Sequence, residues 1–464
     1  MKNDPIFNRE TRKGAENDDA RKGAETDGAR KGAETDGARK GAETDGARKG
    51  AEKDDARKGA ENDGARKGAE NDDATSPNKK IRVAFLITEL SRGGAEKALL
   101  QLATTLDLTR FEPVVFSLSG LARDLENSLV PLFRGAGVET VELGVTGLRN
   151  APSVFRRLKR ELKRRQVDVL QSFMFHANIF GRFAGRAAGV PVVCSGIRVA
   201  ERDAPRRLAF DRWTRSLVDA WVCVGEATAD FSRTVGRLPE KRVFSIPNGV
   251  RVAELETLER ESANADFTWV PEPFGRRKRI VCVGRLAPQK GFDWLLKNAA
   301  TWAPKIAKDW EIWIVGDGPE RDALRRIAEE TGLANVVFFA GWRPNVPEIL
   351  ATADLFALPS RWEGMPNALL EAASVGKAAL CSDVEGVAEI LGDDAAPQIC
   401  AFGDDKSWRD KTLALTNDAA LREELGRRNR NRVAQEFSVE SATRKYEALW
   451  TRLLAEKRKT TRRR

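Results

Sequence analysis

The chain has 464 residues, with 79 lysines and arginines, 69 aspartates and glutamates and a single histidine, which gives a net charge of +10. One histidine and five cysteines without a Cys-x-x-Cys pair exclude a metal site built from these ligands, and we expect no metal or other cofactor. No apolar run reaches the roughly 18 residues of a membrane-spanning helix, and the first residues lack the apolar core of a signal peptide. We therefore expect a cytosolic protein that is at most peripheral to a membrane.

Residues 1–80 are dominated by a nine-residue repeat, Gly-Ala-Glu-x-Asp-x-Ala-Arg-Lys. Copies begin at Gly14, Gly23, Gly32, Gly41, Gly50, Gly59 and Gly68. Alanine is the only apolar residue of the repeat, so the repeat cannot bury enough surface to order itself or to stack into a solenoid. The segment contains 19 basic and 19 acidic residues, and the whole net charge therefore falls on the rest of the chain. We predict a disordered tail that the folded domains do not need.

Residues 81–265 alternate short apolar runs with helical patterns, and we assign them to a first α/β domain. Strands are expected at 82–88, 114–118, 167–172, 192–195 and 221–224. The pair Gly93 and Gly94 follows the first of these strands and opens a helix, but by itself it indicates only a turn. Asn248 and the glycine after it predict a tight turn near the end of the domain. The mixed polar segment 254–274 is the expected linker to a second domain.

His176 is the only histidine, and it follows the strand 167–172 in the sequence Phe-His-Ala-Asn, which ends at Asn178. From the residues alone, a lone histidine is more often structural than functional. Arg198 ends the sequence Gly-Ile-Arg after the next strand, and it fits an ordinary surface cation equally well. The residue pattern leaves the roles of these three side chains open.

Residues 153–166 carry a dense run of cations in a helical pattern. Apolar residues recur at helical spacing within or beside this run, at Val154, Phe155, Leu158 and Leu162. The pattern predicts an amphipathic helix with a basic face, which fits either a solvated surface or contact with anionic lipid headgroups. The basic tail at 457–464 would add to the same attraction. No nucleic-acid reader motif accompanies the charge, so we expect no nucleic-acid partner.

Residues 266–435 again alternate strands and helices. Strands are expected at 280–283, 311–315, 336–339 and 354–358. Glycine turns follow three of these strands, at Gly284, Gly316 and Gly341. Alternation of this kind, with glycine turns at the carboxyl ends of strands, predicts a doubly wound parallel sheet whose ligand crevice lies at that edge.

Two cations follow the first strand of this second domain. Arg285 comes directly after Gly284, and Lys290 comes five residues later. The glycine lets the backbone approach a ligand closely, and two cations at the carboxyl end of a strand suit a diphosphate.

The sequence Arg-Trp-Glu-Gly-Met-Pro-Asn-Ala-Leu-Leu-Glu at 361–371 places two carboxylates eight positions apart. Pro366 suits the first position of a helix, so that Glu363 lies in a strand-to-helix loop and Glu371 lies inside the helix. The helix start presents free N–H groups and a positive dipole end, which favour a phosphate. A sugar–diphosphate–nucleoside fits this arrangement, with one carboxylate on hydroxyls at each end. The alternative is two surface glutamates without a ligand.

Three motifs together resemble the donor half of glycosyltransferase family 4, whose members are retaining enzymes with two facing Rossmann-like domains, the GT-B fold. The motifs are Val-Gly-Arg-Leu-x3-Lys-Gly at 283–291, Gly-Asp-Gly-Pro at 316–319 and Glu-Gly-Met-Pro-x4-Glu at 363–371. The resemblance excludes the tail at 1–80. It implies an N-terminal acceptor domain at 81–265, a C-terminal nucleotide-sugar donor domain at 266–435, and a C-terminal helix with a basic tail at 436–464.

This resemblance also implies an activity: transfer of a hexose from a nucleotide diphosphate sugar to a lipid-linked or polysaccharide acceptor, in cell-surface glycan synthesis. The place of action would be the inner face of the cytoplasmic membrane. Two alternatives remain: a non-catalytic sugar-nucleotide-binding or scaffold protein of the same fold, and a nucleotide-sugar epimerase.

The resemblance assigns roles to individual residues. The catalytic residues it implies are His176, Arg285, Lys290 and Glu363. The donor-binding residues it implies are Gly93, Gly94, Gly284, Gly316, Gly364, Met365, Pro366, Asn367 and Glu371. Arg198 and Asn178 follow as weaker acceptor-side candidates. The chain departs from the family at Gln171 and Phe173, where family members often carry histidines.

Overall fold

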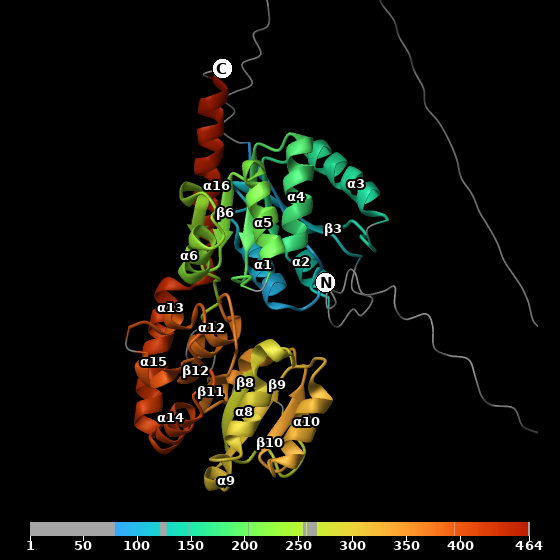
Figure 1. Cartoon of the computed structure of the whole chain (residues 1–464). Helices are drawn as coiled ribbons and strands as arrows, with labels where there is room; N and C mark the ends of the chain where they lie inside the picture. The colour runs from blue at the N-terminus through green and yellow to red at the C-terminus, as the bar shows by residue number, and fades with distance from the viewer. Residues whose placement is uncertain are drawn as a thin grey trace, which may run out of the picture. The chain divides into compact units, whose positions relative to one another are not determined.

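The computed structural model describes residues 79–120, 128–147, 149–202, 204–253, 257, 267–393 and 395–462. The predicted disordered repeat lies outside the described residues, and so does most of the expected linker. Residues Asn78–Arg464 form one unit, which contains two parallel sheets (Figure 1).

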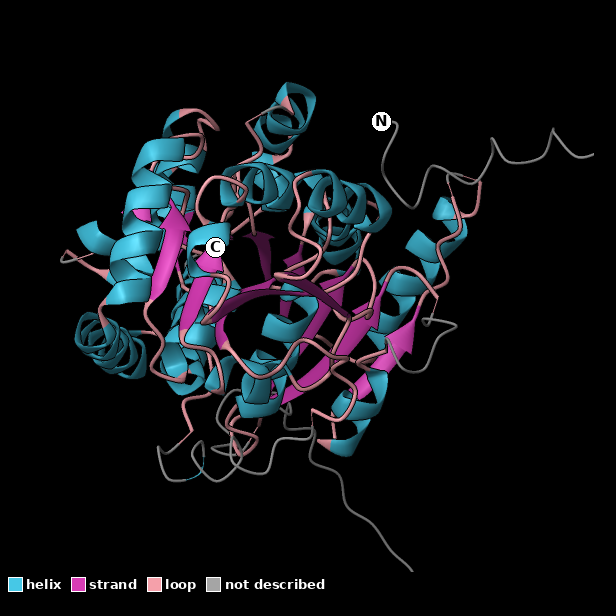
Figure 2. Ribbon diagram, turned by 90° about the horizontal axis from the view of Figure 1, so that it is seen from below, coloured by secondary structure: helices cyan, strands magenta, loops and turns pink. Residues whose placement is uncertain are grey.

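The first sheet contains seven described strands, all parallel, in the order β3-β2-β1-β4-β5-β6-β7. The strands are β1 Ile81–Ile87, β2 Phe111–Ser117, β3 Glu139–Glu142, β4 Val169–Phe173, β5 Val192–Ile197, β6 Ala220–Cys223 and β7 Val243–Ser245. Helices cover both faces, as parallel strands require (Figure 2). The helices of this half are α1 Gly94–Thr105, α2 Val130–Gly135, α3 Ala151–Arg164, α4 Phe175–Ala188, α5 Pro205–Trp213 and α6 Glu226–Thr234, with short 3-10 turns at Arg215–Leu217 and Glu240–Arg242.

The second sheet contains six described strands, also parallel, in the order β10-β9-β8-β11-β12-β13. The strands are β8 Lys278–Val283, β9 Trp310–Val315, β10 Val337–Gly341, β11 Leu355–Leu358, β12 Ala379–Ser382 and β13 Ile399–Cys400. Its helices are α8 Phe292–Ala299, α9 Ala303–Ile306, α10 Arg321–Glu330, α11 Val346–Ala351, α12 Asn367–Ser374, α13 Val387–Leu391, α14 Asp405–Asn417 and α15 Ala419–Glu436, with 3-10 turns at Pro288–Lys290 and Ala396–Gln398. The predicted doubly wound architecture is confirmed for both sheets.

Four strands were not predicted, and each lacks a local signal. β7 has three residues, too few for a periodic pattern. β3 is a four-residue strand, Glu-Thr-Val-Glu, on the edge of its sheet. β12 and β13 have four and two residues, too few for a periodic pattern.

Pro366 was expected at the first helical position, but it is the N-cap of α12, in extended conformation. The helix therefore begins one residue later than expected.

The last helix, α16 Val439–Arg462, crosses back from the second domain and packs on the first sheet. Trp450 is fully buried there, with its ring 5.8 Å from Phe85 of β1 and 6.1 Å from Phe111 of β2. Tyr446 and Leu453 belong to the same apolar cluster. The C-terminal helix was predicted as a segment of its own, and its apolar stripe completes the core of the first domain.

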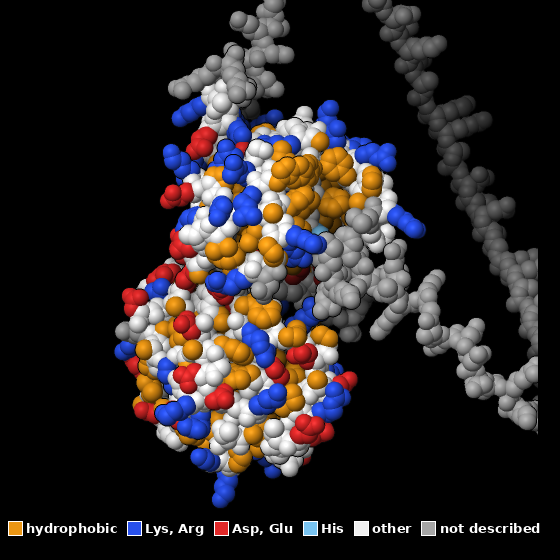
Figure 3. All heavy atoms as spheres, in the orientation of Figure 1, with side chains coloured by type: hydrophobic (Ala, Val, Ile, Leu, Met, Phe, Trp, Pro, Cys, Tyr) orange, Lys and Arg blue, Asp and Glu red, His pale blue; other side chains and the backbone are white. Residues whose placement is uncertain are grey.

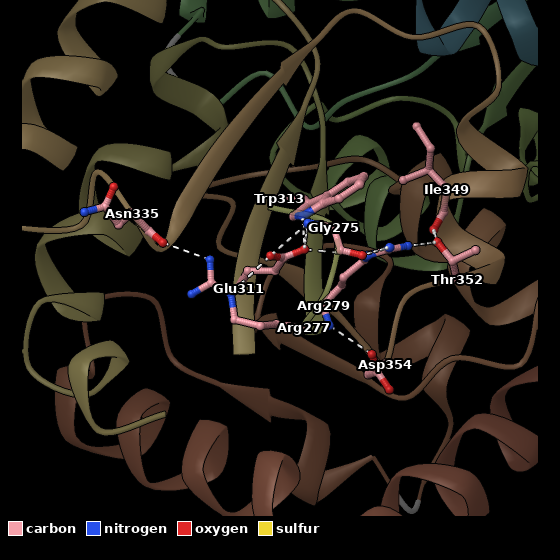
Figure 4. Close-up of polar contacts among 9 residues, drawn as sticks. All are labelled: Gly275, Arg277, Arg279, Glu311, Trp313, Asn335, Ile349, Thr352 and Asp354. Carbon is pink, nitrogen blue, oxygen red and sulfur yellow. Dashed lines mark hydrogen bonds and ion pairs between the residues drawn. The ribbon is translucent and has the colours of Figure 1, made fainter. Parts of the chain in front are cut away.

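The described end of the expected linker packs against the second sheet and is not a solvent-exposed polar segment. Phe267 and Trp269 pack edge-on and obliquely against Trp313 of β9, at centroid distances of 5.8 and 5.9 Å. A buried carboxylate, Glu311, accepts hydrogen bonds from the Gly275 backbone and from Trp313 Nε1, and Arg277 pairs with it at 3.3 Å (Figure 4). This cluster lies at the amino ends of β8 and β9. It anchors the incoming chain at the sheet edge opposite the ligand crevice.

Candidate functional site

Both sheets reverse their strand order at one point, between β1 and β4 in the first and between β8 and β11 in the second. Ligands of open parallel sheets bind at the carboxyl ends of the strands that flank such a point. In the first domain these strands lead to the pair Gly93–Gly94 and to His176. In the second domain they lead to 284–290 and to the loop before α12. Most of the predicted site loops therefore leave the two switch points, whereas Gly316 follows β9 and Arg198 follows β5, each one strand away.

Lys290 and Glu363 form the centre of the second-domain site. Lys290 Nζ lies 2.5 Å from Glu363 Oε1, and the two side chains are 18% and 7% exposed. The hydroxyl of Ser360 donates to the same carboxylate oxygen at 2.7 Å. The sequence assigned these two charged groups to different parts of a ligand. In the structure they contact each other, so each sets the position of the other.

Arg361 fixes the loop that carries Glu363. Its guanidinium donates two hydrogen bonds to the carboxylate of Asp293 on α8, each of 2.8 Å. This bidentate contact holds the pKa of Asp293 below its usual value. The contact fastens the loop to α8, which begins shortly after Lys290. It therefore holds Glu363 in position to pair with Lys290.

Arg285 differs from Lys290. Its side chain is exposed, and it has no hydrogen bond or ion pair with any residue that the structure describes. Behind it, Gly284 and Gly316 approach so closely that a side chain at Gly316 would collide with the Gly284 carbonyl oxygen. Gly316 also has a φ of 141°, which only glycine adopts readily. The close approach of the two glycines brings the carboxyl ends of β8 and β9 together. Arg285 is exposed beside them.

The start of α12 faces the first domain. A side chain at Gly364 would collide with the backbone carbonyl of Arg198, so only glycine permits this approach. Met365 is buried, and its sulfur accepts a hydrogen bond from the Asn248 backbone at 3.3 Å. Gly364 and Met365 therefore form a contact between the domains, and with Pro366 they lead into the N-terminus of α12.

A chain of polar contacts crosses between the domains at this point. Arg198 donates to Asn248 Oδ1 at 2.6 Å, Asn248 Nδ2 donates to Asn367 Oδ1 at 2.7 Å, and Asn367 Nδ2 donates to the Gly94 carbonyl at 2.8 Å. Asn367 is the first residue of α12, and Gly94 is the first residue of α1. The chain thus joins the starts of two helices from different domains at the predicted donor site.

Glu371 also contacts the first domain. Its carboxylate lies 3.6 Å from Lys97 Nζ on α1, and its side chain is 19% exposed. Partly exposed pairs at this distance contribute little to stability. The carboxylate is therefore available to exchange Lys97 for ligand hydroxyls.

The catalytic candidate His176 and the acceptor-side candidate Asn178 differ in their surroundings. Asn178 is buried, accepts a hydrogen bond from Ser172 and donates one to the Gly196 carbonyl, so its side chain braces β4 and β5. His176 is half-buried in the first turn of α4, with its ring 5.6 Å from that of Phe175. It follows Met174, whose φ of 72° is strained for a residue with a side chain. Such strain is concentrated at functional sites, which favours His176 over Asn178 as the group that meets an acceptor.

Burial perturbs two charged groups beside the interdomain contact. Burial raises the pKa of Glu96, in the first turn of α1, from 4.5 to about 7, and Glu89 raises it further. Burial lowers the pKa of Arg198, and the nearby Tyr446 and Glu96 oppose this change. The Glu96 carboxyl lies directly beside Gly93, so an ionisable group adjoins the glycine pair at the start of α1.

The sequence did not single out several of these groups. Lys97 and Glu96 lie on α1 beyond the glycine pair, and Ser360 precedes the motif at 361–371. Asn248 was interpreted only as a turn residue. No local pattern marks them, because their partners are distant in the sequence. The one available signal was position: Lys97, Glu96 and Ser360 are each within a few residues of a predicted ligand loop, whereas Asn248 had no such signal.

No metal site is visible in the described part of the chain: no three histidine, cysteine, aspartate or glutamate side chains are grouped to hold an ion there. The expectation that the protein uses no metal or other cofactor stays a prediction.

Comparison with known proteins agrees with this geometry. Residues 266–432 match the family described as glycosyl transferases group 1, and residues 92–254 match glycosyltransferase family 4. A lipopolysaccharide core biosynthesis glycosyltransferase of Rhizobium meliloti is 27% identical over 303 residues, which is 65% of this chain and 80% of that protein. The Escherichia coli enzyme UDP-Gal:alpha-D-GlcNAc-diphosphoundecaprenol alpha-1,3-galactosyltransferase is 25% identical over 403 residues, which is 82% of this chain and 100% of that enzyme.

Solved structures share the fold. The Anabaena protein HepE in complex with UDP-glucose superposes with a TM-score of 0.66 at 17% identity, over 80% of this chain and all of that one. The match at 92–254 includes every described strand of the first sheet except β1, the match at 266–432 includes the second sheet, and the interval between them lies in the expected linker. The chain therefore belongs to the group 1 glycosyltransferases of family 4, enzymes with the GT-B fold.

Proposed function

We propose that this glycosyltransferase moves a hexose from a nucleoside diphosphate sugar to a lipid-linked or polysaccharide acceptor in cell-surface glycan synthesis, with retention of configuration. The observation that carries the proposal is the Lys290–Glu363 pair at the switch point of the second sheet, directly before the N-terminus of α12. A cation and a carboxylate in contact suit a nucleoside diphosphate sugar. The cation can bind the anionic diphosphate, and the carboxylate can accept hydrogen bonds from the sugar hydroxyls.

The cations act on the leaving group. An ammonium has three donors, and Lys290 uses one on Glu363, so two remain for diphosphate oxygens. Arg285 adds an unpaired guanidinium, and the first N–H groups of α12 add a positive dipole end. These groups stabilise negative charge as the bond between the anomeric carbon and the diphosphate oxygen breaks.

The acceptor attacks from the face that the diphosphate leaves. Its oxygen forms the new bond to the anomeric carbon, and its proton passes to the departing diphosphate oxygen. His176 follows the switch-point strand β4 of the first domain, and we expect it to orient the acceptor or the transferred sugar. Glu363 would hold sugar hydroxyls, and Glu371 would hold ribose hydroxyls after releasing Lys97.

The relatives support the substrate classes. The Escherichia coli relative is named for a UDP-galactose donor and an acceptor linked to diphosphoundecaprenol, and HepE was solved with UDP-glucose. The Rhizobium meliloti relative is named for lipopolysaccharide core biosynthesis. These names favour a uridine diphosphate sugar as the first donor to test.

A lipid-linked acceptor would place the enzyme at the inner face of the cytoplasmic membrane. Val154, Leu158 and Leu162 of α3 are buried within the first domain, so the apolar stripe of this helix is not available to lipid. Its cations remain outside: Arg156, Arg157, Lys159, Arg160, Lys163 and Arg164 are exposed. Each would contribute about 1 kcal/mol of attraction to an anionic surface, screened by salt.

A panel of radiolabelled nucleotide sugars tests the proposed function. We expect label to pass into a polyprenyl diphosphate-linked sugar or a glycan with one donor, and the double variant Lys290→Ala, Glu363→Ala to transfer none. Release of an epimerised free sugar without any acceptor would identify an epimerase instead. Binding of nucleotide sugars without turnover, across donors and acceptors of both classes, would contradict the proposal.

A further inference from the structure

Helix α5 is attached to the first domain by its polar side. Arg182 of α4 is fully buried, and its Nη1 donates to Asp211 Oδ1 at 2.7 Å and to Thr214 Oγ1 at 2.9 Å. Its Nε donates to Ser195 Oγ of β5 at 3.0 Å. Burial raises the pKa of Asp211, while the adjacent Arg182 guanidinium opposes this rise. Because these polar groups occupy the inner side of α5, none of its residues is buried.

The aromatic side chains of α5 lie beside α4 near the surface, with Phe210 half-buried and Trp213 exposed. Phe210 packs 5.3 Å from Trp213 and 6.5 Å from Phe183 of α4, and its ring is also 6.5 Å from Phe175. Trp213 is 71% exposed, and Met174 is 40% exposed. We call Met174, Phe175, Phe183, Phe210 and Trp213 the α4–α5 aromatic patch. Figure 3 shows hydrophobic side chains gathered over this part of the first domain, with lysines and arginines around them.

The rim of the patch is cationic. The guanidinium groups of Arg206, Arg212 and Arg215 have no hydrogen bond or ion pair with any residue in the described ranges. The nearby acids are already engaged, since Asp211 pairs with Arg182 and Glu201 pairs with Arg207. Helix α3 packs against α4 and adds its own exposed cations on the neighbouring surface. An apolar centre inside an unneutralised cationic rim is complementary to the headgroup region of an anionic bilayer.

We infer that the α4–α5 aromatic patch inserts into the headgroup layer of an anionic membrane, with Arg206, Arg212 and Arg215 on the lipid phosphates. Trp213 supplies the insertion, because an indole combines a large apolar body with a polar N–H that stays at the wet boundary. No helix in the described residues has the length and apolar character that crossing a membrane requires, so this contact is interfacial. The basic face of α3 then acts at longer range, as the electrostatic part of the same surface.

The position of the patch connects it to the site. Phe175 belongs to the patch, and its ring lies against His176, which follows the switch-point strand β4. Insertion would therefore hold the acceptor side of the enzyme next to the bilayer surface. This link to the acceptor rests on the proposed function, whereas the insertion itself does not.

Sedimentation with phosphatidylglycerol vesicles and with phosphatidylcholine vesicles tests the inference on the full chain. We expect the wild-type protein to bind the anionic vesicles, and Trp213→Ala to bind them roughly tenfold or more weakly, the factor for withdrawing one large apolar side chain. The triple variant Arg206→Glu, Arg212→Glu, Arg215→Glu should lose binding altogether. Leu132→Ala, at an exposed apolar residue of α2, and Arg325→Glu, at an exposed cation of α10, are the matched controls and should bind as the wild type does.

The outcomes separate the inference from the proposed function. Because Trp213 is exposed, its variant should melt at the wild-type temperature, which excludes misfolding as the cause. Loss of vesicle binding in a protein that transfers no sugar would support the patch and contradict the proposed function. Unchanged vesicle binding by Trp213→Ala would overturn the inference. The inference would also be wrong if Trp213→Ala bound vesicles normally but lost transfer to a polyprenyl-linked acceptor. The patch would then bind the lipid chain of the acceptor and not the membrane.

Discussion

The two domains share one architecture but present different chemistry at their switch points. In the second domain, charged side chains meet in a fixed arrangement: Lys290 contacts Glu363, and Arg361 ties the loop to α8. In the first domain, the residues at the corresponding strand ends are one half-buried histidine, a glycine pair and an asparagine that serves only as a brace. A diphosphate is the same in every donor of this class, so its groups can be built rigidly. Acceptors differ, and the first domain offers a strained turn and an apolar patch in place of fixed charges.

The leaving-group cations provide the strongest test of this contrast. Lys290→Ala and Arg285→Ala should each lower kcat by about 10²–10³, the effect of removing one preorganised charge-stabilising group. Steady-state rates with the preferred nucleotide sugar measure this. Arg325→Ala, at an exposed cation of α10, is the control and should keep its rate. Wild-type rates in both site variants would remove the cations from the site.

A buried carboxyl in the first domain predicts a pH-dependent stability. The folded pKa of Glu96 is about 7 against 4.5 ordinarily, so the folded state retains a proton that the unfolded state releases. Stability should therefore fall as pH rises from about 4.5 to about 7, by about 3 kcal/mol at most. Glu96→Gln should abolish this component. Urea unfolding of both proteins at about pH 5 and about pH 8 should show the variant gaining relative stability only at the higher pH. A constant difference would show that the carboxyl is ionised throughout.

The two glutamates of the motif at 361–371 should have separable effects. Glu363→Ala should not weaken the binding of free UDP, because the loss of its carboxylate frees Lys290 for an anion, whereas kcat should fall about hundredfold. Glu371→Ala should weaken UDP binding about tenfold through the lost ribose contact. Calorimetry with UDP on both variants measures the split. Equal losses of UDP affinity would contradict the assignment of the two ends of the donor.

The polar chain between the domains should have a smaller effect. Asn367→Ala removes hydrogen bonds to both Asn248 and Gly94, so kcat/KM should fall about tenfold through weaker domain contact. Asn335→Ala, at an exposed loop position of the second domain, is the matched control. If Asn367→Ala and Asn335→Ala have the same kcat/KM, the chain does not contribute to the assembled site.

The smallest effect is expected from the repeat. Deleting residues 1–76 should leave Tm and activity essentially unchanged, because a repeat with only alanine as its apolar residue makes few packed contacts. Thermal unfolding and the transfer assay on the shortened protein check this. A marked drop in Tm or activity would mean that the repeat docks on one of the two domains.

The sequence by itself determined the two α/β halves and the loops of the donor side. These features are local: an apolar strand, a glycine at its carboxyl end and a cation or carboxylate within a few residues are all encoded in one short segment. The same locality explains why β3, β7, β12 and β13 were missed, since their pairing partners and not their own residues make them strands.

Only the tertiary structure decided which of these groups touch. Lys290 and Glu363 are 73 positions apart, and Asn248 reaches Asn367 across 119 positions. The orientation of α5 depends on Arg182, a buried residue of another helix, which pairs with Asp211. The place of α16 depends on the core that it completes in the first domain. Local propensity fixes an element and its periodic face. The neighbour against which that face packs is set by long-range contacts, and a single sequence does not contain the distances that choose among them.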